Sequence, residues 1–585
     1  MFDMHAKVTG ALRANLKYIV IGLICCLILL FYIRFDQVAL SSDDDVQLNL
    51  LASGALGPDS QYLIYINIVY GFFLKFLSHL APAVNWYLVC SLFSNLCAIV
   101  SVCVLICRKM SLPSAVTVSL LCMLFFSPNF LISTQFTTNV FIYAAAGYFW
   151  LLYAIKKKKR LAVLPATLFL SLAVCWRAAA FLMTVPFFGA VLLVHVLQNR
   201  KTLPKGKITA RMMLPALPFA VALMLVGLDT YAYAKDPGWS YFKERVKALV
   251  EIQDRGFVDY LNHTDLYDEA GFPMSTVNLI TNWIDNDPEV YSLERLRKMG
   301  DVKRTYDPIS FRADFNILAE TAHQILSRFF FRQVWLPWVY VTGIIAFALR
   351  RDRKRLWMVL LSSLLVCGVY YALICYGRLG WHVEIGIWLM AFLLPFEDFF
   401  TDDRDADGLP AAGNSSSERY LQRAACALMI CLTLLCGIFL VQDPQEHRLA
   451  VAPITKREES KSHLALEYVR ANKENFYVVC SPLSRGYWGA ETVYDLTYAN
   501  SSDFENTCWL GGWFAGSPLG NYHAHEAGFT NPMRALLERP DTFLVATDDE
   551  AEWIYYYLAD NYSNQIVFHR VYGGEGFGVF RFDMI

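Results

Sequence analysis

The sequence is poor in charged residues. Of its 585 residues, 18% are Asp, Glu, Lys or Arg, while 56% are hydrophobic and 15% are aromatic. Soluble domains carry roughly 25% charged residues, so this composition argues against a soluble protein. The formal net charge of −1 and the lack of a separate basic face argue against a nucleic-acid partner. The chain is therefore predicted to be an integral membrane protein.

Several short motifs are also missing. No GxxxxGK[ST] loop occurs, which excludes an ATP-driven pump. No small-x-small cleavage site follows the first apolar run before Asp43, so we expect a retained membrane anchor rather than a signal peptide. The His523–Glu526 segment lacks a further spaced ligand, which favours a polar loop over a metal site.

Eleven apolar runs approach or reach the length of about 17–25 residues that a helix needs to cross a bilayer. They lie near residues 18–34, 86–107, 112–128, 138–155, 161–176, 178–198, 212–230, 333–349, 356–376, 381–397 and 424–441. Lys and Arg cluster in alternate connections, including 156–160 and 350–355, and such clusters mark cytoplasmic loops. The N-terminus is therefore predicted to be cytoplasmic, with residues 231–332 and 442–585 outside.

The predicted fold is a polytopic α-helical membrane protein with two domains. Residues 1–441 form the transmembrane domain, with an acidic first outer loop (35–61), a juxtamembrane helix (62–80) and a long outer loop (231–332). Strand-like and helix-like runs alternate in residues 442–585, a pattern typical of a small α/β domain, here extracytoplasmic.

Two helices are predicted in the long outer loop. One is marked by apolar residues at helical spacing, namely Trp239, Phe242, Val246 and Leu249. The other is predicted to begin at Asp287-Pro288, since Asp caps a helix and Pro fits its first turn, and to stop at Gly300. We expect this loop to cover a site without belonging to it.

Two cysteines lie in the C-terminal domain. The chain has 15 cysteines, and of these Cys480 and Cys508 alone fall in residues 442–585. An oxidising exterior would make them a disulfide pair. Spacing alone does not show the required geometry, so two free thiols remain equally open.

An acidic run follows the first apolar segment. Asp43, Asp44 and Asp45 lie just beyond it. Carboxylates are energetically costly beside the hydrocarbon of a membrane, so an acidic cluster in this position is a candidate functional site. They also fit a solvated helix N-terminus. Alternatively, Asp44 or Asp45 is the general base of a sugar transfer, and a second carboxylate holds a divalent ion or stabilises positive charge on the sugar. Asp59 is a weaker third candidate.

Cations on the same predicted face could hold a phosphate group. Arg34, Arg177 and Arg378 lie in outer turns, against the bias of basic residues toward the cytoplasm. The planar guanidinium suits phosphate, although each arginine also fits a side chain that reaches the lipid head groups. Lys75 could assist or could anchor its own helix, and His382 could bind substrate or simply pack at the interface.

The first 230 residues resemble the GT-C superfamily of membrane glycosyltransferases. Its members combine an acidic first outer loop, an aromatic juxtamembrane helix and a span with a basic end, matched here by Asp43–Asp45, Tyr62–Leu80 and Trp86–Lys109. The Ser127-Pro128 turn and the basic stop at Lys156–Arg160 extend the resemblance. The resemblance implies a polyprenyl-phosphate-linked sugar as donor.

The chain departs from this family in its second outer loop. Many members carry Arg or Asp there, where this sequence has Gln135 followed by Thr137–Asn139. Gln135 becomes a candidate substrate-binding residue, no cofactor is certain, and a divalent metal stays open.

The predicted function is transfer of a sugar from the lipid donor to a glycan, lipid or protein acceptor of the envelope, on the outer face of a bacterial plasma membrane. A transporter, flippase or polymerase of lipid-linked glycans is the first alternative, but it predicts internal repeats that we do not find. A non-catalytic envelope assembly protein is the second alternative, and it would leave the aspartates dispensable.

Overall fold

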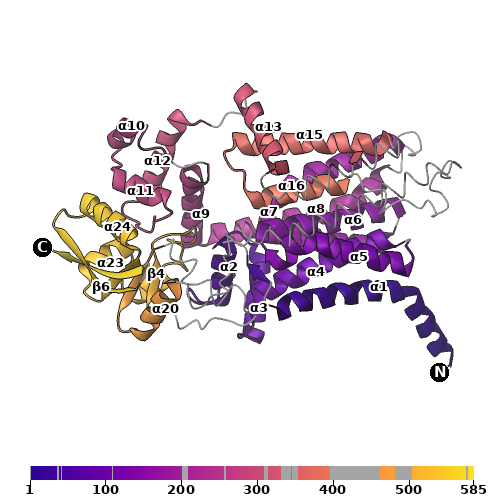
Figure 1. The fold of residues 1–585 in the computed structure, drawn as a ribbon, viewed down its shortest axis with the longest axis horizontal. Coiled ribbons are helices and arrows are strands. Elements are labelled where there is room, and N and C mark those ends of the chain that lie inside the picture. Colours follow the sequence, from indigo (N-terminus) through magenta and orange to yellow (C-terminus); the bar gives the residue numbers. More distant parts are fainter. Residues whose placement is uncertain are drawn as a thin grey trace.

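The computed structural model describes most of the chain. The described residues are 2–35, 38–40, 43–108, 110–157, 159–199, 208–255, 258–308, 314–330, 341, 344–345, 353–394, 461–480, 504–574 and 577–585. They form an elongated molecule with a helical bundle at one end and a mixed helix-and-sheet part at the other (Figure 1). We call the second part the head, and it comprises residues 236–306 and the described residues of 461–585.

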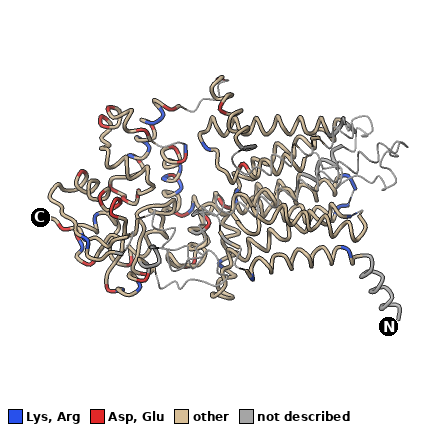
Figure 2. The backbone as a smooth tube through the Cα atoms, viewed as in Figure 1, with Lys and Arg blue, Asp and Glu red and all other residues tan. Residues whose placement is uncertain are grey.

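The bundle holds seven described helices that are long and apolar enough to cross a membrane, as a multi-pass membrane protein requires. The bundle helices are α1 (Phe2–Arg34), α4 (Trp86–Cys107), α5 (Leu112–Ser127), α6 (Phe136–Lys157), α7 (Val163–Asn199), α8 (Ile208–Lys235), α15 (Arg353–Cys375) and the shorter α16 (Trp381–Leu393). Few charged residues occur along their middle, whereas acidic residues gather in the head (Figure 2).

The eleven predicted spans are confirmed only as a set of apolar helices. Two of them, 161–176 and 178–198, correspond to the two helices of α7, which meet at Arg177. The run at 381–397 contains a described helix of only 13 residues, α16. Most of 333–349 and all of 424–441 lie outside the described residues.

Helix α7 reverses direction at Arg177. The backbone there is extended, with φ −164° and ψ 101°, although both flanks are helical. Leu170, seven residues before the turn, packs on Gly147, and Thr184, seven residues after it, lies 2.7 Å from the hydroxyl of Tyr148. The two halves of α7 therefore lie alongside α6 at the same level, which agrees with two predicted spans joined by a tight turn.

Helix α6 is the centre of the bundle. Its sequence is apolar on all sides, as expected of a helix surrounded by others, and its window of highest hydropathy is 83% buried. Glycines let two neighbours approach it closely. A Cβ at Gly147 would lie 2.7 Å from Leu170 of α7, and a Cβ at Gly386 of α16 would lie 2.1 Å from the ring of Phe141.

Helix α3 (Ile68–Leu80) crosses the head end of the bundle (Figure 1). The predicted juxtamembrane helix begins at residue 68 rather than 62. The side chain of Asn67 caps its start by accepting from the N–H of Val69. One apolar face is exposed, through Phe72, Phe73, Phe76 and Leu80. An exposed apolar face on a helix across the bundle end fits a position in the membrane interface.

Two short strands bring the first loop to the start of α6. Strand β1 (Ala39–Leu40) pairs in parallel with β2 (Ser133–Thr134). Helix α2 (Asp43–Ser53) follows β1, while the turn η1 (Pro128–Ile132) precedes β2. The pairing therefore places the acidic run beside the N-terminus of α6.

The head contains a five-stranded sheet in the order β4-β3-β5-β7-β6. Its strands are β3 (Phe476–Val479), β4 (Thr507–Trp509), β5 (Thr542–Ala546), β6 (Ile566–Gly574) and β7 (Phe577–Met584). The first three are parallel, and β7 runs antiparallel to both β5 and β6. Four helices accompany them, α20 (Lys461–Ala471), α22 (Tyr522–Glu526), α23 (Pro532–Glu538) and α24 (Asp548–Asn561).

The long loop after α8 packs on this sheet. It forms α9 (Pro237–Leu249), η3 (Val250–Asp254), α10 (Thr264–Glu269), α11 (Met274–Thr281), α12 (Leu293–Tyr306) and α13 (Phe315–Phe330). The predicted helix around 239–249 is confirmed as α9. Ile252, Leu279 and Met299 share one hydrophobic core with Val478 and Leu544 of the sheet. Part of the loop and the C-terminal segment are thus packed as one unit.

The predicted helix start at Asp287 is wrong. Helix α12 begins after Ser292 and continues past Gly300 to Tyr306. The carboxylate of Asp287 is fully buried and accepts hydrogen bonds from the hydroxyls of Tyr557 and Tyr562, at 2.7 and 2.6 Å. Asp287 also accepts from the N–H groups of Glu289 and Val290, so it caps a single turn rather than a helix and joins the loop to α24.

The predicted disulfide is not formed in the structure. Cys480 and Cys508 are both free and buried. Cys508 is paired in register with Val478 of the adjacent parallel strand, so Cys480 lies two residues further along. With strands about 4.8 Å apart and a rise of about 3.3 Å per residue, the Cα atoms of such diagonal neighbours are about 8 Å apart, beyond the usual Cα separation of a disulfide.

Candidate functional site

Asp45 joins three elements at the head end of the bundle. Its side chain is 1% exposed, and its Oδ1 accepts hydrogen bonds from the hydroxyl of Tyr87 at 2.8 Å and from the backbone N–H of Phe136 at 3.0 Å. Tyr87 belongs to α4 and Phe136 begins α6. Asp43 and Asp44 open helix α2 with Asp45, but their side chains lie outside the described residues.

A polar segment caps the N-terminus of α6. Gln135 is buried, and its Oε1 accepts from the backbone N–H groups of Thr137 and Thr138 at 2.7 and 2.8 Å. These are among the first N–H groups of the helix, which have no partner within it. Gln135 therefore orients the start of α6, and the structure shows this role for a residue proposed from sequence as a substrate contact.

A buried polar network lies beneath this segment. Asn139 donates to Ser91 at 2.9 Å, and Asn95 donates to the Asn139 side chain at 2.9 Å and to the carbonyl of Phe130 at 2.6 Å. Polar groups in a membrane bundle are stable only when they are hydrogen-bonded. The network therefore fixes α4 and α6 relative to each other below the candidate site.

Arg177 contacts the same segment from α7. Its Nη1 donates to Thr137 Oγ1 at 2.6 Å, and its guanidinium carbon lies 4.8 Å from the ring centre of Phe136 and 5.1 Å from that of Tyr65. Arg177 is half-buried. The extended backbone at the reversal of α7 turns this side chain toward α6, and the aromatic rings favour its positive charge.

Arg378 and Arg177 both lie within electrostatic range of one carboxylate, that of Asp254. It forms an ion pair with Asp254 of η3, with 2.7 Å between Nη2 and Oδ2. Burial raises the pKa of the Asp254 carboxyl, while the charges of Arg378 and Arg177 act in the opposite direction. Asp254 therefore lies within electrostatic range of both arginines, although no motif in the sequence marks it as a site residue.

His382 lies within electrostatic range of these two arginines. Its backbone carbonyl accepts from Thr138 Oγ1 at 3.3 Å, which brings the start of α16 to the start of α6. The structure thus gathers five of the candidate residues at one end of the bundle: Asp45, Gln135, Arg177, Arg378 and His382.

The other candidates lie elsewhere or make other contacts. Lys75 donates to the backbone carbonyl of Asp59 at 2.7 Å, and Nδ1 of His79 lies 3.6 Å from an Asp59 carboxylate oxygen. These contacts anchor α3 rather than build a phosphate site. Arg34 is exposed at the end of α1.

Glu384 is a buried acid that the sequence reading missed. It lies in α16 and is 3% exposed, and the hydroxyl of Tyr370 donates to its Oε2 at 3.4 Å. Ionisable residues inside membrane bundles often serve a function. A single Glu in an apolar run was the available signal.

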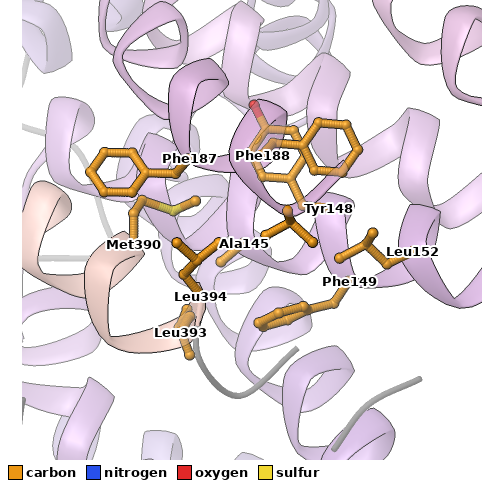
Figure 3. Close-up of a pocket in the computed structure, with 10 residues that line it drawn as sticks. Ala145, Tyr148, Phe149, Leu152, Phe187, Phe188, Met390, Leu393 and Leu394 are labelled. Carbon is orange, nitrogen blue, oxygen red and sulfur yellow. The ribbon is translucent and has the colours of Figure 1, made fainter. Parts of the chain in front are cut away.

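Away from these contacts, described residues line an apolar cavity and a charged hollow. An apolar cavity between α6, α7 and α16 includes Tyr148, Phe188 and Met390 in its lining (Figure 3). Its volume of about 20 Å³ holds roughly one water molecule, which is too small for a sugar. A hollow of about 450 Å³ between α9 and α12 is lined by charged side chains that include the paired Glu244 and Arg297.

Among the described residues, no group of three His, Cys, Asp or Glu side chains could hold a metal ion. The His523–Glu526 segment forms most of the short helix α22. No protein-family model matches this chain, and no curated protein sequence matches it.

Proposed function

We propose that this protein is a GT-C-like membrane glycosyltransferase that moves a sugar from a polyprenyl-phosphate donor to an envelope glycan, lipid or protein. The observation that carries the proposal is the convergence on Phe136 and Thr137. Asp45 of the acidic run and Arg177 of the α7 reversal contact these two neighbouring residues. A carboxylate and an arginine near one membrane boundary are the groups that such a transfer needs.

The acidic start of α2 would act on the acceptor. An acceptor oxygen attacks the anomeric carbon, its proton passes to a carboxylate, and the bond from that carbon to the phosphate oxygen breaks. The lipid phosphate leaves with the bonding electrons. Asp44 and Asp45 are the proposed bases, and Tyr87 and the N–H of Phe136 keep Asp45 in place.

The two arginines would hold the donor phosphate. Arg177 and Arg378 are both partly exposed, and both act on Asp254 electrostatically. A phosphate between them would share Arg378 with Asp254 or replace it. Charge-assisted hydrogen bonds from guanidinium groups would also stabilise the charge that develops on the leaving phosphate.

Asp45→Asn and Asp44→Asn test the proposal. Asn keeps an oxygen that can accept from Tyr87 and Phe136, so the contacts of Asp45 survive while its basicity is lost. Turnover with a short-chain polyprenyl-phosphate sugar should fall by about 10²–10⁴, with donor binding largely retained. If both single variants and the double variant transfer sugar at the normal rate, the protein is not this transferase.

We propose that the head faces outward from a bacterial plasma membrane and that the N-terminus is cytoplasmic. Leu161, between α6 and α7, and Leu261, in the head, are similarly exposed, at 80% and 76%. Leu261→Cys should react with a membrane-impermeant maleimide in intact cells, whereas Leu161→Cys should react only after permeabilisation. The reverse pattern would overturn the orientation.

A further inference from the structure

A loop of the C-terminal segment reaches the candidate site. It follows β4 and covers residues 510–517, so it leaves the carboxyl end of the parallel strands, where open α/β sheets bind their ligands. The ring of Trp513 in this loop lies 4.7 Å from the ring of Tyr65, measured between centroids. Tyr65 in turn lies under the guanidinium of Arg177.

Two buried polar atoms in this place have no hydrogen-bond partner. They are Nε1 of Trp513 and Oε1 of Gln47, in side chains that are 7% and 6% exposed. Gln47 lies against the residue that precedes Trp513, because a Cβ at Gly512 would lie only 3.1 Å from Gln47 Oε1. A buried polar atom without a partner is unfavourable, so a donor and an acceptor left open together indicate a ligand that supplies both.

The backbone is strained on both sides of the aromatic pair. Ile64, next to Tyr65, has φ 63°, which is rare for a β-branched residue, and its N–H donates to the hydroxyl of Tyr233 at 2.8 Å. Trp283 has φ 61°, and its carbonyl accepts from the N–H of Gly512 at 3.0 Å. Strain of this kind persists where surrounding contacts hold a residue in place, and such residues cluster at binding sites.

We propose that Tyr65, Trp513 and Gln47 form the subsite for the transferred sugar ring, a neutral hexose. The inference rests on the proposed function and deepens it. The apolar C–H groups of a pyranose match the part of the Tyr65 ring that Arg177, Phe136 and Trp513 leave exposed, while hydroxyl groups match the indole N–H and the amide oxygen. In the donor the sugar is bonded directly to the phosphate. Arg177, proposed to hold the phosphate, and Trp513, proposed to hold the sugar, both contact the ring of Tyr65.

The subsite would be formed jointly by the head and the end of the bundle. Tyr65 comes from the segment before α3 and Gln47 from α2, whereas Trp513 comes from a loop more than 400 residues later. Sugar selectivity would therefore depend on the C-terminal segment as well as on the bundle end, while the reacting groups stay on the bundle.

Saturation-transfer NMR tests the subsite without turnover. The probe is a mixture of the methyl glycosides of glucose, galactose and mannose, added to the full chain in lipid nanodiscs, because maltoside detergents carry the same ring. At least one glycoside should receive saturation from the wild-type protein. Trp513→Phe removes the N–H and keeps an aromatic ring, and Gln47→Leu removes the oxygen at similar volume. Each should weaken binding by about 3- to 10-fold, the loss of one hydrogen bond.

Trp553→Phe in α24 is the matched control and should bind as the wild type does. Equal melting temperatures of the variants would exclude a loss caused by unfolding. The subsite is refuted if no glycoside receives saturation from the wild type, or if Trp513→Phe and Gln47→Leu bind like Trp553→Phe. Asp45→Asn should still bind, so loss of the subsite and loss of the transfer step are separate results.

Discussion

Asp45 and Arg177 both hold Phe136, the first residue of α6. Oδ1 of Asp45 lies 3.0 Å from the backbone nitrogen of Phe136, and the guanidinium carbon of Arg177 lies 4.8 Å from the centre of its ring. The two charged residues come from α2 and α7, which are separated by more than 100 residues in sequence. Their relative position is thus set by the start of α6, so changes at either residue should be felt at the other.

Tyr87→Phe should impair both stability and turnover. It removes a hydrogen bond to a fully buried carboxylate, which we expect to destabilise the fold by about 1–3 kcal/mol. Tyr148→Phe is the matched control, because it removes a buried hydrogen bond to Thr184 deeper in the bundle. Thermal unfolding should shift for both variants, but sugar transfer per folded molecule should fall only for Tyr87→Phe. Equal transfer by the two variants would argue against a role of Asp45.

Arg177→Ala should weaken donor binding by about 10- to 100-fold, because it removes charge-assisted hydrogen bonds. Arg177→Lys should recover only part of this loss, since an ammonium lacks the planar fork and the stacking on Phe136. Arg34→Ala removes an exposed arginine at the end of α1 and serves as the control. Titration with a polyprenyl-phosphate sugar measures the affinity, and an unchanged affinity of Arg177→Ala would remove this residue from the phosphate site.

Much of the candidate site could be predicted because it depends on local sequence. Arg177 was expected in a tight turn between two apolar runs, and the structure has that reversal. Asp45 and Arg378 were expected at the same end of the bundle, because each lies at the boundary of an apolar segment. Apolar length and the positions of charges are sufficient for these inferences.

The partners of these residues could not be predicted, since they depend on tertiary packing. Asp254 meets Arg378, and Trp513 meets Tyr65, across more than 100 residues of sequence. The helix predicted at Asp287 failed for the same reason. Its Oδ1 caps a single turn by accepting from the N–H groups of Glu289 and Val290, while its Oδ2 accepts from Tyr557 of α24 and from Tyr562 just beyond that helix.

Gly386→Ala should destabilise the bundle. The new methyl group would lie about 2.1 Å from the Phe141 ring, so α16 would have to move away from α6, at a cost of about 1–3 kcal/mol. Gly368→Ala in α15 is a strong control, because nothing lies within 4 Å of its added Cβ. It should be neutral or slightly stabilising, since Ala favours helix. Thermal unfolding in nanodiscs compares them, and equal stability would contradict the close packing of α16.

Asp285 should make the stability of the head depend on pH. Burial raises the pKa of this carboxyl from 3.8 to about 6, although Arg245 lies 2.8 Å away and acts in the opposite direction. The folded protein therefore binds more protons than the unfolded one between about pH 4 and pH 6, so stability from this group falls as the pH rises through that window. The free energy of unfolding changes by about 3 kcal/mol over the whole titration, and about 2 kcal/mol of this falls between pH 4 and pH 6.

Asp285→Asn isolates this effect. The variant loses the ion pair with Arg245, which changes its stability by an offset, but it no longer titrates at this position. The difference in unfolding free energy between wild type and variant should therefore change by about 2 kcal/mol from pH 4 to pH 6.5, with the wild type relatively more stable at low pH. A constant difference would show that the carboxyl is not perturbed.

Cys480 and Cys508 should remain reduced and inert in the folded protein. Both thiols are buried, and burial raises the pKa of each, so little reactive thiolate forms near neutral pH. A soluble maleimide should leave both unmodified under native conditions and modify both after unfolding without a reductant. Leu261→Cys, with an exposed thiol in the same head, should react at once and confirms that the reagent is active. A linked Cys480–Cys508 peptide in a non-reducing digest would show instead that the two strands approach more closely than in this structure, and that the pair closes a disulfide after all.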